Sequence, residues 1–235
     1  MKPTIQSWVV FRALALTILI ACTGGISGGW AQSTDNKLEI VATAASAGDV
    51  TAQYLLGFLY YKGIDVQQDY AKAAHWFRKA AEKGDPEAQS ILGNMYAEGR
   101  GLPRDYVQSM TWFRRAVQQG NASAQYELAV MYAKGRGVPQ DMVQAAKWYL
   151  RAAEQGHEQS QLALGFLYLE GLGMPQDFVM AHQWFNLAAS ALKGDEREKA
   201  LSARDGLTKR MSPEQTAEAQ RMARAWMQKK MGKKE

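Results

Sequence analysis

The sequence predicts an all-α protein, a right-handed superhelical α-solenoid of helix-turn-helix repeats with terminal capping helices. The chain of 235 residues aligns with itself at a fixed offset of 36 residues, which indicates a repeat architecture. Within each aligned segment, apolar residues recur at helical spacing, and no alternating apolar run is long enough for a strand. Because a lone helical pair cannot bury both of its apolar stripes, we expect the pairs to stack into a curved solenoid.

Four columns of matched residues define the repeat. They divide the chain into units at 48–83, 84–119, 120–155 and 156–193. Chance does not place rare residue types in register four times. The columns are Trp76, Trp112, Trp148 and Trp184; Asp69, Asp105, Asp141 and Asp177; Tyr60, Tyr96, Tyr132 and Tyr168; and Gly63, Gly99, Gly135 and Gly171.

The second unit explains why each unit is expected to form two helices. Asp85 is a good N-cap, Pro86 suits the first helical position, and Gly99 ends the helix. Pro103 keeps the loop from extending the helix, and Asp105 caps the second helix. We therefore interpret the Asp column as helix caps rather than as metal or acid–base carboxylates. The Trp column is interpreted as packing between units rather than as a row for stacking sugars or bases.

Three departures from the repeat are local. The first loop, residues 63–66, lacks the second Gly and the Pro of the other loops. Ala129 replaces the helical Gly of the third unit, and we expect it to push its neighbour slightly apart. The fourth unit carries two extra residues before Gly194, which marks the end of the regular array.

The repeated pattern resembles a known family. Ala-x-x-x-Leu-Gly-x-x-Tyr-x-x-Gly is followed by Gly-x-x-x-Asp and then by Ala-x-x-Trp-Phe-x-x-Ala-Ala-x-x-Gly. This pattern, over residues 48 to about 193, resembles the Sel-one-like repeats, which are relatives of tetratricopeptide repeats. The resemblance implies that the first helix of each pair lines the concave face of the solenoid, and that the side opposite its packing stripe meets solvent or a partner.

That side of the first helices supplies the candidate binding residues. An apolar concavity with aromatic members is the usual form of a peptide or helix receptor. The alternative is that tight curvature buries these side chains against neighbouring helices. The candidates are Tyr54, Phe58, Tyr61, Asn94, Tyr126, Val130, Leu162 and Phe166.

Residues 1–31 are similar to an export signal. The apolar run at 13–21 is far shorter than the ~20 residues that span a bilayer. Two processing sites compete: Cys22, the sole Cys, fits a bacterial lipoprotein box, and cleavage after Ala31 is the alternative. Either route places the mature chain outside the cytoplasm, and a lipid on Cys22 would tether it without a transmembrane span.

The two ends of the array are predicted to be caps. Residues 32–47 are expected to form an N-terminal capping helix over the first unit. Residues 194–235 are expected to form C-terminal capping helices and a basic tail. Within them, Asp195 to Leu207 is predicted to be one charged helix, and a capping box at Ser212–Gln215 begins another.

Catalytic motifs appear only in fragments. Ser190 and Lys193 fit the Ser-x-x-Lys pair of penicillin-recognising enzymes, but no Ser-Asp-Asn or Lys-Thr-Gly accompanies them. His157 begins a zincin-like string that lacks its second His, and His75 and His182 occupy other columns of the repeat. We therefore predict no catalytic residue, no metal and no cofactor.

Charge gives little support to nucleic-acid binding. The formal net charge is +5, but residues 32–193 hold 15 basic and 16 acidic side chains. A nucleic-acid binder needs a basic stripe on its main face. Only the last lysines, Lys229, Lys230, Lys233 and Lys234, offer one, and a solvated tail explains them better.

The predicted function is that of a non-enzymatic scaffold or adaptor of the bacterial cell envelope. It would be exported to the periplasm or to the periplasmic face of an envelope membrane, and would bind a partner protein or peptide in the concave face. The alternative is an envelope hydrolase or penicillin-binding protein with weak β-lactam-directed activity, which the resemblance keeps open.

Overall fold

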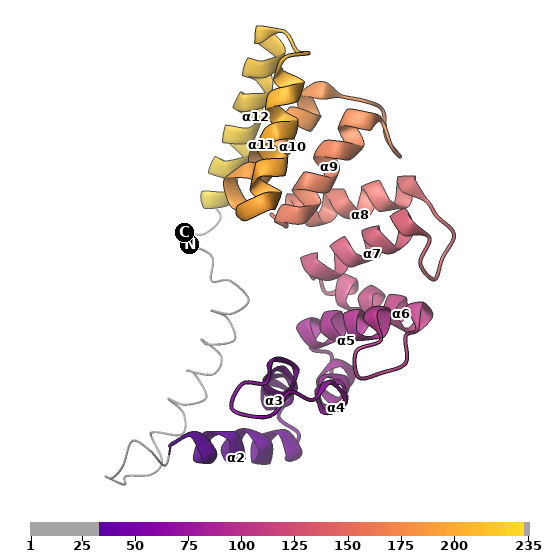
Figure 1. Cartoon of the computed structure of the whole chain (residues 1–235), viewed down its shortest axis with the longest axis vertical. Helices are drawn as coiled ribbons and strands as arrows, with labels where there is room; N and C mark the ends of the chain where they lie inside the picture. Colours follow the sequence, from indigo (N-terminus) through magenta and orange to yellow (C-terminus); the bar gives the residue numbers. More distant parts are fainter. Residues whose placement is uncertain (1–32, 233–235) are drawn as a thin grey trace. The chain divides into compact units, whose positions relative to one another are not determined.

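The described part of the chain, residues 33–232 of a computed structural model, contains eleven α-helices and no strand (Figure 1). The all-α expectation is confirmed. Consecutive helices pack as pairs, α3 with α4, α7 with α8 and α9 with α10. The helices are α2 (Ser33–Ser46), α3 (Val50–Lys62), α4 (Tyr70–Glu82), α5 (Pro86–Glu98), α6 (Tyr106–Gln118), α7 (Ala122–Lys134), α8 (Met142–Glu154), α9 (Glu158–Glu170), α10 (Phe178–Ala191), α11 (Gly194–Thr208) and α12 (Pro213–Met231).

The helix ends follow the local chemistry of the repeat. The side chain of Asp85 accepts a hydrogen bond from the amide of Ala88 at 2.8 Å, and Pro86 occupies the first turn of α5. At the other end, Gly99 has a left-handed φ of 73° and its amide donates to the carbonyl of Met95 at 2.9 Å. The sequence therefore stops each first helix after 13 residues and turns the chain back.

Two compact units divide the chain, and the division falls inside α6. One ends at Trp112 and the other begins at Phe113. We refer to them as the N-terminal unit and the C-terminal unit.

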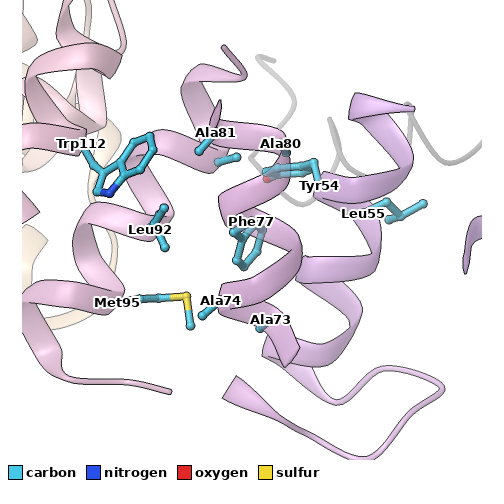
Figure 2. Packing of buried hydrophobic residues seen from close by; sticks show 11 residues of the cluster. Tyr54, Leu55, Ala73, Ala74, Phe77, Ala80, Ala81, Leu92, Met95 and Trp112 are labelled. Carbon is cyan, nitrogen blue, oxygen red and sulfur yellow. The ribbon is translucent and has the colours of Figure 1, made fainter. Parts of the chain in front are cut away.

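Phe77 of α4 lies at the centre of the N-terminal unit and is 0% exposed. Figure 2 shows its ring between Tyr54 on one side and Leu92 and Met95 on the other. The ring also faces Gly57 of α3, where a Cβ would lie only 2.9 Å from a ring carbon. The missing side chain lets the two helices approach closely, and burial of a Phe side chain contributes about 1.5–3 kcal/mol.

The loop before α6 locks one repeat onto the preceding one. Gly101 has φ 69°, and a Cβ built on it would fall on the backbone carbonyl of Tyr70, at the start of α4. Gly173, with φ 72°, packs in the same way against the carbonyl of Met142 at the start of α8. The equivalent residue of the first loop is Asp65, which adopts the same left-handed conformation with φ 57°.

The C-terminal unit repeats this core design. Phe185 of α10 is buried against Gly165 of α9, where a Cβ would fall on the ring. In the third repeat, Ala129 stands at the glycine position and Tyr149 at the Phe position, and both are buried. A second cluster joins α9, α10 and α11 through Leu162, Ala181, Phe185, Ala200 and Leu207.

Helices cover the ends of the repeat array. In the N-terminal unit, α2 packs on α3 through Leu38, Val41 and Ala45. In the C-terminal unit, α11 and α12 both pack on α10. Helix α12 begins with the expected capping box, in which the Ser212 amide donates to the Gln215 side chain at 2.9 Å.

Candidate partner-binding surface

In the N-terminal unit, the candidates on α3 divide into one core residue and two surface residues. Tyr54 is only 3% exposed and its ring meets the edge of Phe77 with centroids 5.7 Å apart, so the expectation that it faces a partner is wrong. Phe58 and Tyr61, one and two turns further on, are partly exposed. Asn94 of α5 is also partly exposed. We call Phe58, Tyr61 and Asn94 the N-terminal patch.

Tyr61 is held in a network of rings and cations. Its hydroxyl accepts a hydrogen bond from the Arg100 guanidinium at 2.8 Å, and its ring meets that of Tyr70 edge-on at 5.3 Å. Arg100 also pairs with Glu98 at 2.8 Å. The ammonium of Lys62 lies 5.5 Å from the Tyr61 ring. The ring is therefore fixed in position, and the residue is partly exposed.

In the C-terminal unit, Tyr126 and Val130 of α7 are partly exposed. Tyr126 packs against Tyr149 at 5.8 Å and stacks on His157 at 4.8 Å. Burial raises the pKa of the Tyr126 hydroxyl, and the nearby carboxylate of Glu127 adds to the shift. The phenol is therefore neutral at physiological pH.

The candidates on α9 also separate by burial. Leu162 is only 8% exposed and belongs to the core that joins α9, α10 and α11, so its prediction as a partner contact is wrong. Phe166 is partly exposed, with its ring edge-on to Phe185 at 4.9 Å and the Lys199 ammonium 5.2 Å from its centre. We call Tyr126, Val130 and Phe166 the C-terminal patch.

His157 has a structural position that sequence inspection missed. It is the N-cap of α9, and its Nδ1 lies 3.3 Å from the Ser160 amide and 3.0 Å from the Ser160 hydroxyl. A Ser–His hydrogen bond is also part of many nucleophilic sites. Here Ser160 is 0% exposed, so a substrate could not reach its hydroxyl. The pair caps a helix.

Ser190 and Lys193, the other catalytic fragment, lie at the end of α10 and the start of α11. The Ser190 hydroxyl donates to the carbonyl of Leu187 at 2.7 Å, as a helical Ser often does. Both side chains are at the surface. Nothing in this geometry prepares Ser190 as a nucleophile.

The Asp column lies at the starts of the second helices. Asp69, Asp141 and Asp177 accept backbone N–H bonds at 2.9, 2.9 and 3.0 Å. Asp105 accepts two, from Val107 at 2.9 Å and Gln108 at 3.0 Å. For Asp69 the Lys72 amide holds the pKa of the carboxyl below its ordinary value. These geometries are those of helix caps.

The Trp column lies within the packing of the helices. Trp76 packs near α2 and α3, and Trp112 belongs to the core around Phe77. Trp148 and Trp184 both belong to the cluster that joins α7, α8, α9 and α10. Trp112 and Trp184 are buried, which leaves them no open face for a sugar or base.

Some predicted features lie outside the described residues 33–232. These are the export segment 1–31 with Cys22 and Ala31, and the last lysines, Lys233 and Lys234. Lys229 and Lys230 lie in the last turn of α12. Between residues 33 and 232, no His, Cys, Asp and Glu side chains gather in a group that could hold a metal ion. In the same range, no helix combines the length and apolar character that a membrane span requires.

Comparisons with known proteins place this geometry in context. Four segments match the Sel1 repeat, at residues 50–85, 86–121, 122–157 and 158–191. A Sel1 repeat protein from Oxalobacter formigenes is 29% identical with a TM-score of 0.69, and the match covers 82% of this chain and 80% of that one. A comparison with curated proteins gave no match.

A protective antigen of uropathogenic Escherichia coli with the same type of repeat fold is also similar. It is 40% identical with a TM-score of 0.64, and the match covers 66% of this chain. The match covers 33% of the antigen, so this chain corresponds to about a third of that protein's length.

Proposed function

Because the chain belongs to the Sel1 repeat family, we propose that it is a non-enzymatic binding protein of the bacterial cell envelope, which holds a partner protein or peptide on the first-helix faces of its repeats. The observation that carries this proposal is the set of partly exposed aromatic side chains on those faces. These partly exposed residues are Phe58, Tyr61, Tyr126 and Phe166, and the ring of each packs against another ring.

Rigid aromatic side chains of this kind are typical binding anchors. They offer a large contact area and lose little conformational entropy when a partner binds. In the N-terminal patch, Phe58 and Tyr61 are braced by Tyr54 and Phe77. In the C-terminal patch, Tyr126 is braced by Tyr149 and Phe166 by Phe185.

Charge beside these rings indicates what kind of partner would fit. Lys62 lies 5.9 Å from the Phe58 ring, and Lys199 lies 5.2 Å from the Phe166 ring. Both lysines are exposed. A segment that presents apolar side chains next to Asp or Glu would match a ring and an ammonium in each patch.

The envelope location rests on the export-like segment 1–31. The non-enzymatic role is supported by the surroundings of two serines, Ser160 and Ser190. Ser160 is buried and bound to His157, and the hydroxyl of Ser190 is bound within its own helix. Neither group is arranged to attack a substrate.

Partner recovery from the native envelope tests the proposal. The tagged full-length protein is compared with a Phe58→Ala, Tyr61→Ala, Tyr126→Ala variant after crosslinking and purification. We expect the variant to recover at least about tenfold less partner, because each lost anchor of this type costs on the order of 1–2 kcal/mol.

The matched control changes exposed side chains on second helices. Val107, Val143 and Lys147 are exposed on α6 and α8, and replacing all three with Ala should leave partner recovery unchanged. Circular dichroism checks that both variants keep their helical content. Full recovery by a folded aromatic variant would reject the first-helix faces as the binding site.

A further inference from the structure

The N-caps of the four first helices occupy one column of the repeat, and the last of them differs in chemistry. The side chains of Asp49, Asp85 and Asn121 accept the capping hydrogen bond at 2.6, 2.8 and 2.8 Å. The fourth member is His157. It is the one member of the column that gains or loses a proton near neutral pH.

The cap bond requires the neutral form of His157. Its Nδ1 lies 3.3 Å from the Ser160 amide nitrogen, which can only donate. The Ser160 hydroxyl, 3.0 Å from the same nitrogen, also donates when Nδ1 carries the lone pair. The ring proton must then sit on Nε2. Adding a second proton at Nδ1 would place two N–H groups face to face.

The surroundings of the ring oppose its protonation. The imidazole stacks on the Tyr126 ring of α7, with centroids 4.8 Å apart and planes at 27°. Burial lowers the pKa of His157, and the neighbouring carboxylate of Glu158 opposes this shift in part. The positive end of the α9 dipole also disfavours a cation at this position.

Other charged groups approach from α11 and α12. Glu196 of α11 lies 3.4 Å from the side chain of Gln159 and contributes to the raised pKa of Tyr126. On the α12 side, Trp226 lies against Gly156, and the Lys230 ammonium is 5.4 Å from the Trp226 ring.

We propose that His157 is a proton-controlled helix cap. Its protonation removes the capping hydrogen bond at the start of α9 and the stacking contact with the Tyr126 ring. Above the titration range, the neutral ring caps α9 and supports Tyr126 from one side. Below it, the imidazolium loses the Ser160 bond and leaves its place at the start of α9. This response to pH is a property of the protein alone and does not require a bound partner.

Nuclear magnetic resonance of the full-length protein tests the cap directly. The ring signals of the three histidines are followed from pH 8 to pH 4.5 and assigned with His75→Asn, His157→Asn and His182→Gln variants. We expect His157 to titrate below its ordinary value of about 6.5. The amide signal of Ser160 should shift with the same midpoint. The proposal would be overturned by a His157 midpoint at or above that value. It would also be overturned by a Ser160 amide signal that does not shift with pH.

Thermal unfolding gives an independent readout. His157→Asn installs the non-titrating cap already present at Asn121. Between pH 7.5 and pH 5, the melting temperature of the wild type should fall by about 2–4 °C more than that of this variant, the shift expected when one cap is lost. His75→Asn, which changes an exposed histidine, should melt like the wild type at both pH values. An equal fall in His157→Asn and the wild type would also contradict the proposal.

Discussion

At the residue scale, the second glycine of the loop motif connects neighbouring repeats. Gly101 and Gly173 bring their backbones so close to the preceding second helix that no side chain fits. Asp65 holds the same left-handed conformation in the first loop, where no repeat precedes it. An Asp tolerates this conformation better than most residues do. The departure seen in the first loop is therefore explained by the absence of a repeat to pack against.

A pair of alanine substitutions tests this explanation. Gly101→Ala should lower the free energy of unfolding by at least about 2 kcal/mol, because it adds a collision with the Tyr70 carbonyl to the cost of a left-handed Ala. Asp65→Ala replaces one left-handed L residue with another and adds no collision, so it should lose about 1 kcal/mol or less.

Urea unfolding followed by tryptophan fluorescence measures both changes. Trp76 and Trp112 lie in the N-terminal unit and report on its packing. Similar losses in the two variants would mean that Gly101 is needed for its backbone conformation alone. The close contact between repeats would then contribute nothing measurable to stability.

Some helix N-caps can be recognised from the sequence and others cannot. Asp85 is recognisable from its residue type and from the Pro86 that follows it, and the structure shows its capping bond. For His157, the incomplete zincin-like string argues against a metal site, and the sequence suggests no other role. A His is a rare cap, so residue type gives no signal. Its alignment with Asp49, Asp85 and Asn121 at the 36-residue offset was the signal that could have identified it.

At the element scale, the two helices of a repeat carry different patterns. The second helices have one apolar stripe, and α4 buries Ala73, Ala74 and Phe77 along it. The first helices lack a single apolar stripe, because they pack against second helices on two sides; α9 packs on both α8 and α10. Spacing along such a helix cannot separate a core face from a binding face. This is why Tyr54 and Leu162 were placed wrongly while their neighbours Phe58 and Phe166 are accessible.

The contact between α10 and α11 includes a buried histidine. His182 is 2% exposed. Burial lowers its pKa, and the Arg204 guanidinium of α11 lowers it further while Asp205 acts in the opposite direction. A lowered pKa in the folded state means that the unfolded chain binds the proton more readily. The contribution of His182 is therefore complete above about pH 6.5, the pKa of a free His, and is lost as the pH falls through the folded value.

Substitution of this histidine should flatten the acid dependence of stability. His182→Gln keeps a polar side chain but removes the titration, so its melting temperature should fall less than that of the wild type between pH 7.5 and pH 5. His75→Gln is the matched control, because His75 is exposed on α4. Calorimetry at several pH values makes the comparison. An unchanged fall in His182→Gln would mean that this group does not control acid sensitivity.

At the scale of the whole molecule, the repeat explains most of the chain. Self-alignment was enough to predict an all-α fold with four two-helix repeats, because each unit must bury its apolar stripes against the next. Residues in the repeated columns, such as Asp69 and Trp184, cap or pack helices. The proposed function assigns binding to the residues that vary between repeats on the first-helix faces. The sequence could identify them as candidates, but the packed structure is needed to show which of them are partly exposed.

The proposed function requires that a partner bind the first-helix faces and not the second helices. A photoreactive phenylalanine analogue placed at Tyr61 or Tyr126, and in parallel at the exposed Val107 or Val143, tests it in the native envelope. Covalent adducts with a partner should form from the two tyrosine positions and not from the two valine positions. Adducts that form from the valine positions instead would show that the partner binds the second helices.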